Sequence, residues 1–113
     1  MLSRGAAAAE LRLSRDYYSA VENAGATPVE VLREFETNTW VSVRLVATGD
    51  STSHFVPFTN VVEFAPGEIR HSVVVTLVDD SLPGAPFERV RLRLEDPSPG
   101  AYLGQPAEAS LAI

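Results

Sequence analysis

The sequence has no cysteine and no lysine, and both absences limit what the protein can do. Without cysteine the chain forms neither disulfides nor thiolate metal sites, and the redox compartment in which it works stays open. All nine of its basic residues are arginines, and its fifteen acidic residues bring the formal net charge to −6. Because an acidic domain repels phosphate backbones, we expect no nucleic acid among its partners.

Long apolar runs are missing as well. No stretch approaches the roughly 20 apolar residues that a membrane-spanning helix needs, so we expect no direct membrane insertion. The start of the chain is too weakly hydrophobic for a signal peptide, because Glu10 and Arg12 closely follow its short run of alanines. We therefore interpret residues 1–10 as a leader or linker. Residues 11–113 have the size of one domain, and the chain is 45% hydrophobic, which is enough for a core.

What the chain does contain is short segments in which apolar and polar residues alternate, the pattern of half-buried β-strands. The clearest is residues 90–94, where three aliphatic side chains alternate with two arginines. Residues 40–45 and 109–113 follow the same pattern. The continuous, mostly β-branched run at 73–78 is typical of a strand that is buried on both faces or lies centrally in a sheet.

Residues that favour turns separate these segments, notably Gly, Pro, Asn and Asp. The spacing predicts an all-β protein: a seven-stranded antiparallel Greek-key β-sandwich with immunoglobulin-like proportions. Its core is expected to be filled by the alternating aliphatic residues, with Tyr18 beside them. The main members of this predicted core are Val41, Val43, Leu45, Val73, Val75, Leu77, Val90, Leu92 and Leu94.

Five landmarks in order along the chain resemble the Calx-beta domain family, and the resemblance covers residues 11–113. They are an aromatic-x-x-x-Glu-x-x-Gly pattern at 18–25, an aliphatic strand ending in arginine at 29–33, Phe-x-Pro-Gly-Glu at 64–68, Asp-Asp at 79–80 and Gly-Ala-x-Leu-Gly at 100–104. Any one of these motifs is weak evidence, whereas five in the right order are specific. The chain is identified as a divergent member of this family.

The resemblance implies a non-catalytic module rather than an enzyme. The leading interpretation is a structural and protein-interaction module of a larger cell-surface or extracellular-matrix adhesion protein. It would lie in an extracellular ectodomain, with neighbouring domains of the parent chain and a protein as its partners. The alternative is a calcium-binding regulatory module. It could then be a cytoplasmic domain of a membrane protein, because family members also occur in cytosolic loops of sodium/calcium exchangers.

Calcium binding depends on carboxylates that match the family's ligands by position. These candidates are Glu22, Asp79, Asp80 and Glu88. Two departures weaken the match: His54 stands where the family has an aspartate, and residues 81–87 contain no acid where the family usually has two. Calcium requires six to eight oxygen ligands, and neutral imidazole is a poor substitute. The sequence therefore predicts a weak or vestigial calcium site and no firm cofactor.

His54 also lies near two serines and Asp50, which raises a hydrolase alternative. No nucleophile elbow or oxyanion hole accompanies these residues, so we expect no catalysis. His71, the other histidine, is expected near the start of a strand in a structural role.

Two further features of the sequence are candidates for protein contacts. Trp40 is expected to be buried or half-buried in the sandwich, with a role as a partner-binding anchor as the alternative. A stripe of three arginines along one strand face, Arg89, Arg91 and Arg93, could bind an acidic partner or a glycan sulfate. The expected arrangement is instead that these arginines form cross-strand pairs with acids such as Glu30 or Glu34.

Overall fold

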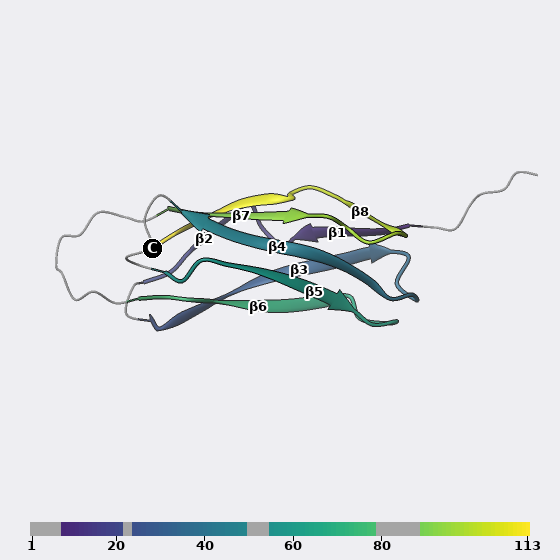
Figure 1. Ribbon diagram of the computed structural model, residues 1–113, viewed down its shortest axis with the longest axis horizontal. Helices are drawn as coiled ribbons and strands as arrows, with labels where there is room; N and C mark the ends of the chain where they lie inside the picture. The colour runs from purple at the N-terminus through teal and green to yellow at the C-terminus, as the bar shows by residue number, and fades with distance from the viewer. Residues whose placement is uncertain (1–7, 22–23, 50–54, 79–88) are drawn as a thin grey trace, which may run out of the picture.

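A computed structural model describes residues 8–21, 24–49, 55–78 and 89–113, and these form two β-sheets that pack face to face (Figure 1). The described residues contain nine strands: β1 (Ala9–Leu13), β2 (Tyr17–Ser19), β3 (Ala26–Phe35), β4 (Val41–Gly49), β5 (Phe58–Phe64), β6 (Arg70–Thr76), β7 (Arg89–Glu95), β8 (Ala101–Leu103) and β9 (Glu108–Ala112). The four-stranded sheet has the order β6-β3-β1-β8, and the five-stranded sheet has the order β2-β9-β7-β4-β5. The predicted all-β immunoglobulin-like sandwich is confirmed.

The structure has nine strands rather than seven for two reasons, one near each end of the chain. The first predicted strand is split, because β1 pairs with β3 in one sheet and β2 pairs with β9 in the other. The second extra strand is β8, which pairs with β1 and lies within the Gly-Ala-x-Leu-Gly motif at 100–104, where a turn was expected. The predicted last strand at 109–113 corresponds to β9, which pairs with β7.

The core lies between the two sheets, and alternation along each strand fills it. Of the nine aliphatic side chains predicted for the core, eight are buried and Val73 is partly buried against them. Tyr18 is also buried, and its hydroxyl lies 2.8 Å from the Ser14 hydroxyl oxygen. Period-two alternation thus identified the inward-facing residues correctly, because successive side chains on a strand point to opposite faces.

The prediction that residues 73–78 form a central or doubly buried strand is wrong. β6 lies at the edge of the four-stranded sheet, and Val74 on its outer face is 56% exposed. A run of valines satisfies the preference for a pleated strand without requiring cover on both faces. His71 is the second residue of β6, and its ring packs edge-on against Phe64 with the ring centroids 5.6 Å apart.

Pro28 lies within β3 although proline has no N–H to donate to a neighbouring strand. β1 ends at Leu13, opposite Val31, so the stretch of β3 that includes Pro28 pairs with β6 alone. Proline is tolerated in a strand where its missing N–H points to an edge. The early departure of the chain into β2 therefore explains how the sheet accommodates Pro28.

No helix in the described ranges has both the length and the apolar character needed to cross a membrane. The sandwich has two distinct ends. β3, β5 and β7 finish at one of them, named here the Arg33 end, and β4, β6 and β9 finish at the other, named here the Ile113 end (Figure 1).

Candidate functional site

The segments that carry the candidate chemistry attach to the Ile113 end. β4 finishes there at Gly49, which pairs with Val90 near the start of β7. On the other sheet, the Leu77 N–H donates to the carbonyl oxygen of Gly25 at 3.0 Å. The described residues that flank positions 22–23, 50–54 and 79–88 therefore lie together at one end of the sandwich (Figure 1). This is the arrangement that a loop-built ligand site requires.

The four candidate calcium ligands themselves lie outside the described residues: Glu22, Asp79, Asp80 and Glu88. Three of them are bonded directly to described residues of the Ile113 end, because Glu22 follows Val21, Asp79 follows Val78 and Glu88 precedes Arg89. Within the described part of the chain, no group of three or more His, Asp or Glu side chains is placed to hold a metal ion. The calcium site stays a prediction.

His54 and the residues around it also lie outside the described ranges. The two departures from the family's ligand set are therefore known from the sequence alone. They are His54 and the acid-free stretch at 81–87. The hydrolase alternative, which depended on the same residues, likewise gains nothing from the geometry.

Trp40 is not in the core, so the expectation of a buried or half-buried tryptophan is wrong. Its side chain is 67% exposed, and it immediately precedes β4 at the Arg33 end. Strand pairing begins one residue later, where Val41 pairs with Phe64. The alternation that buries Val41 therefore places Trp40 on the solvent side. A large exposed aromatic residue is available for contact, and its role as a partner-binding anchor stays a prediction.

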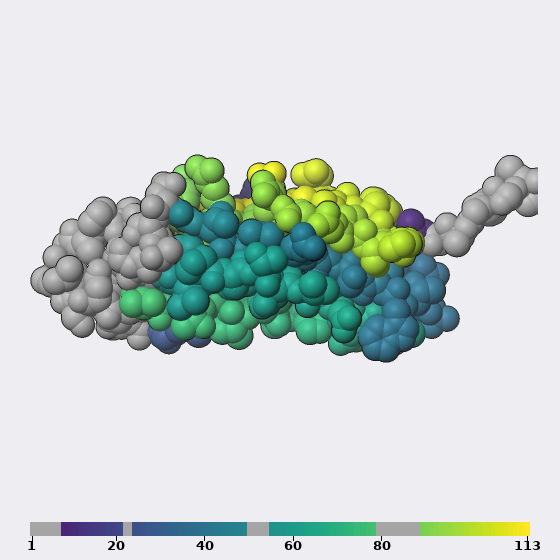
Figure 2. Space-filling model, in the orientation of Figure 1, coloured from purple at the N-terminus to yellow at the C-terminus, as the bar shows by residue number. Residues whose placement is uncertain are grey.

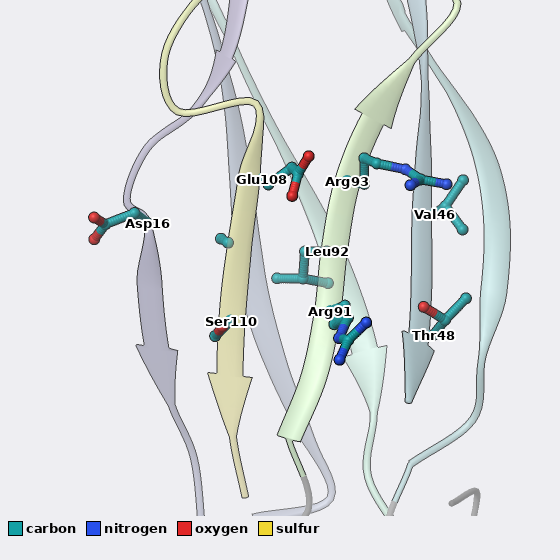
Figure 3. Close-up of a pocket in the computed structure, with 9 residues that line it drawn as sticks. Asp16, Val46, Thr48, Arg91, Leu92, Arg93, Glu108 and Ser110 are labelled. Carbon is teal, nitrogen blue, oxygen red and sulfur yellow. The ribbon is translucent and has the colours of Figure 1, made fainter. Parts of the chain in front are cut away.

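Arg91 and Arg93 point from β7 onto the outer face of the five-stranded sheet, at a shallow hollow of about 420 Å³ (Figure 3). Arg93 is neutralised within its own strand, because its guanidinium lies 3.0 Å from a carboxylate oxygen of Glu95. Arg91 lies between Thr48 on β4 and Ser110 on β9. Among the described residues, no carboxylate forms a salt bridge with Arg91, so this residue presents one cation flanked by two hydroxyls.

The predicted pairing of the arginine stripe with Glu30 or Glu34 is wrong. Both acids belong to β3, which lies in the four-stranded sheet, whereas the arginines belong to β7 in the other sheet. Glu34 instead pairs with Arg12 of the neighbouring strand β1 at 2.6 Å, and Glu30 lies 3.6 Å from Arg70 of β6. Cross-strand pairs form only between neighbours on one face of one sheet, and sheet membership is not encoded in the alternation.

Arg33 is the residue whose importance the sequence analysis missed. It is only 3% exposed, and it is the one buried charged residue in the described part of the chain. Its guanidinium donates to four backbone carbonyl oxygens: those of Glu36 at 2.9 Å, Thr39 at 2.6 Å, Ala65 at 3.2 Å and Glu68 at 3.5 Å. The Thr39 hydroxyl oxygen accepts a further bond at 3.2 Å. A buried charge survives only when its donors are satisfied, and here carbonyl dipoles satisfy them.

The acceptors of Arg33 come from two loops, one between β3 and β4 and the other between β5 and β6. The two loops also bond directly, because the Gly67 N–H donates to the Thr37 carbonyl at 2.7 Å. Arg33 thus holds together two loops, each of which connects one sheet to the other. The sequence did carry a signal: in the alternation Val29, Val31, Arg33, the arginine falls on the inward phase of the strand.

The split first strand, the inward arginine and the two-sheet topology define an immunoglobulin-like β-sandwich module. The family model described as the Calx-beta domain matches residues 6–113, which is nearly the whole chain. The chain belongs to the Calx-beta domain family. No curated protein matches it significantly by sequence.

Solved structures support this assignment. The apo-form Calx CBD1 domain superposes with a TM-score of 0.87 at 25% identity, covering 94% of this chain and 96% of that one. The structure described as CBD12 from CALX1.2 gives 0.85 at 26% identity, covering 92% of this chain but only 43% of that longer one. The Calx CBD2 domain gives 0.85 at 12% identity, which shows a shared fold.

Proposed function

We propose that this domain is a non-catalytic structural and protein-interaction module of a larger cell-surface or matrix protein, working in its extracellular part. One observation carries the proposal. β1 begins at the Arg33 end, where Ala9 pairs with Phe35, whereas β9 finishes at the Ile113 end, where Ala112 pairs with Arg89 (Figure 1). A chain that passes through a rigid sandwich from end to end can align neighbouring domains in a row, and contacts between such domains are typically modest and polar.

Two exposed features would serve a protein partner. Arg91, between the hydroxyls of Thr48 and Ser110, suits a carboxylate on the partner, because guanidinium groups bind carboxylates in a fixed geometry. Trp40 offers a large apolar contact at the Arg33 end, and tryptophan and arginine are the residue types that dominate interface energies. The family membership and the matched multi-domain structure support neighbouring domains as partners.

Hydroxyl-radical footprinting tests this proposal, because exposed aromatic side chains report contacts directly. Trp40 is 67% exposed and Tyr17 is 52% exposed, so both should be oxidised readily in the isolated domain. We expect oxidation of Trp40, or of Tyr17 in the row of Arg91, to fall at least threefold in the full-length parent protein. Tyr18, which is buried, serves as the internal control. Equal oxidation of both exposed residues in the two samples would refute an interaction role for these surfaces.

A regulatory calcium site is the second candidate function, and a separate observation favours it. Described residues near Glu22, Asp79, Asp80 and Glu88 in the sequence meet at the Ile113 end, where Gly49 pairs with Val90, Leu77 bonds to Gly25 and Ala20 bonds to Ala112. One matched structure is described as calcium binding domain CBD12 of CALX1.1, at 26% identity. Oxygen ligands of this number suit a weak site of the kind found in extracellular modules, with a millimolar dissociation constant.

Thermal unfolding with and without calcium separates the two functions. At ten times its dissociation constant, a ligand that binds only the folded state stabilises it by about 1.4 kcal/mol. We expect calcium, if it regulates this domain, to raise the melting temperature, and Asp79→Asn to abolish that rise. Asp96→Asn is the matched control, because Asp96 follows β7 at the opposite, Arg33 end. A melting temperature that does not change with calcium up to ten times a millimolar dissociation constant would eliminate the regulatory candidate and leave the structural proposal in place.

A further inference from the structure

The outer edge of β6 lacks the short length or the proline that protects three other exposed stretches of sheet edge, while the remaining edge strand, β5, carries the charged Glu63. The edge strands β2 and β8 have three residues each, and Pro28 interrupts the exposed stretch of β3. Short edges, prolines and charges are the usual means by which proteins prevent edge-to-edge pairing. β6 has seven residues and no proline, and after Arg70 at its start the stretch from Ser72 to Thr76 contains no charged residue.

Hydrogen bonds at the two ends of β6 establish which of its backbone groups face outward. The Arg33 N–H donates to the carbonyl of Ile69, and the Leu77 N–H donates to the carbonyl of Gly25. Hydrogen-bonded pairs alternate along an antiparallel ladder, so the odd-numbered residues of β6 bond to β3. The N–H and C=O groups of the even-numbered residues Arg70, Ser72, Val74 and Thr76 therefore point away from the sheet.

The chain itself occupies one end of this outward edge. The Val56 N–H donates to the Thr76 carbonyl at 3.0 Å, and Phe55 forms a β-bridge with Leu77. Beyond this point the chain continues into β5, which joins the other sheet. A groove of about 290 Å³ is left between β5 and β6, which run side by side (Figures 1 and 2). Three residues with outward backbone groups remain beside it: Arg70, Ser72 and Val74.

We propose that this edge pairs with the same edge of a second copy of the chain, forming an antiparallel dimer centred on Ser72. In this register Ser72 meets its own counterpart, and Arg70 meets Val74 of the other copy. All three N–H groups and all three C=O groups of each copy then find a partner, and Thr76, whose carbonyl is already bonded, is not needed. The register sets Arg70 against the uncharged Val74 and not against its own counterpart, and this compatibility is the argument for a second copy over an unrelated strand.

The side chains agree with the same register. Arg70 and Val74 lie on the outer face, where the exposed aliphatic stem of Arg70 can cover the 56% exposed Val74 of the other copy. No two like charges meet directly across the pair. The net charge of −6 on each copy opposes association at long range, so pairing should strengthen as salt screens that repulsion.

Sedimentation velocity on the 113-residue chain tests the proposal over a range of protein concentrations. We expect a monomer–dimer equilibrium that tightens at least threefold between about 0.15 M and about 1 M salt, as the screening length falls from about 8 Å to about 3 Å. Amide hydrogen exchange should slow at Ser72 and Val74 as the concentration of dimer rises. A chain that stays monomeric at every concentration and salt level overturns the proposal.

Two matched substitutions at one position identify the edge. Ser72→Pro removes an outward N–H that β3 does not use, and should weaken the dimer at least tenfold while the monomer stays folded. Ser72→Ala keeps that N–H and should leave the dimer unchanged. If Ser72→Pro unfolds the chain, Val74→Arg replaces it, because it sets an arginine against Arg70 of the other copy. A dimer that survives either folded variant forms through another surface, and this result rejects the proposal.

Discussion

At the Arg33 end of the sandwich, one buried side chain holds two loops, whereas at the Ile113 end the described flanks are joined by backbone hydrogen bonds. Arg33 donates to carbonyls of both the β3–β4 and β5–β6 connections. At the other end, backbone bonds such as Leu77 N–H to Gly25 and Ala20 N–H to Ala112 join neighbouring segments. The candidate ligand carboxylates adjoin described residues of the Ile113 end in the sequence, and their calcium site stays a prediction. The comparison shows that a buried charge joins the loops of one end, whereas backbone hydrogen bonds join the described segments of the other.

The largest change in stability is expected when the guanidinium of Arg33 is removed. Arg33→Met fills part of the volume but leaves buried carbonyls without their donor. We expect a loss of about 3 kcal/mol or more in the free energy of unfolding, because several carbonyls lose their donor at once and each buried acceptor left unsatisfied costs about 1 to 3 kcal/mol. Urea denaturation measures it. Arg70→Met, at an exposed arginine, is the control and should change stability by no more than about 0.5 kcal/mol.

A loss below about 1 kcal/mol for Arg33→Met, on the scale of one ordinary hydrogen bond, would show that the loops of the Arg33 end hold together without the guanidinium. The two ends would then be equivalent in their stability, and the contrast would disappear.

Replacing a glycine with positive φ at each end should have a smaller effect on stability and also compares the two ends. Gly67 (φ +89°) lies in the loop held by Arg33, and Gly25 (φ +86°) lies at the Ile113 end; a Cβ at either meets no atom within 4 Å. Alanine in this conformation costs about 1 to 2 kcal/mol from backbone strain alone. We expect Gly67→Ala to cost more than Gly25→Ala, because Arg33 and Thr37 prevent its turn from relaxing. Guanidinium denaturation of the two variants tests this order, and the reverse order would contradict it.

The smallest effect on stability is expected for an ion pair on the outer face of the four-stranded sheet. Glu34→Gln removes the carboxylate that pairs with Arg12 at 2.6 Å, but both side chains are partly exposed. Exposed ion pairs contribute about 0.2 to 1 kcal/mol and weaken in salt. We expect a melting temperature lowered by a few degrees at most in dilute buffer, and unchanged in about 1 M salt, where the screening length is about 3 Å. A larger, salt-independent loss would assign Glu34 a structural role beyond this pair.

The sequence predicted the inward-facing residues well and the sheet edges badly. Alternation identified the core positions of β4 and β7 because each side chain's face depends only on its neighbours in the strand. The same reasoning placed residues 73–78 centrally, whereas β6 is an edge strand. A strand's place in its sheet depends on which other strands pair with it, and a run of valines contains no record of that pairing.

The candidate site shows the same division at the level of single residues. The motifs at 22–25 and 79–80 identified acids whose flanks meet at one end of the fold, because both follow directly from strands that end there. The arginine stripe was assigned the wrong partners, since these depended on the sheet to which its strand belongs. Trp40 was expected in the sandwich, although the alternation that buries Val41 places it on the solvent side. Arg33 stood on the inward phase of a strand, but only the two loops around it explain how a charge can be buried there.

The amino-acid pattern by itself determined an all-β sandwich, its core-facing residues and membership of the Calx-beta family, because these follow from local alternation and short motifs. Only the tertiary structure decided which strands switch sheets, which edges stay open and which charges meet. Those outcomes depend on contacts between segments far apart in the chain, such as Arg33 with Ala65. No local pattern specifies such contacts before the two sheets have packed together.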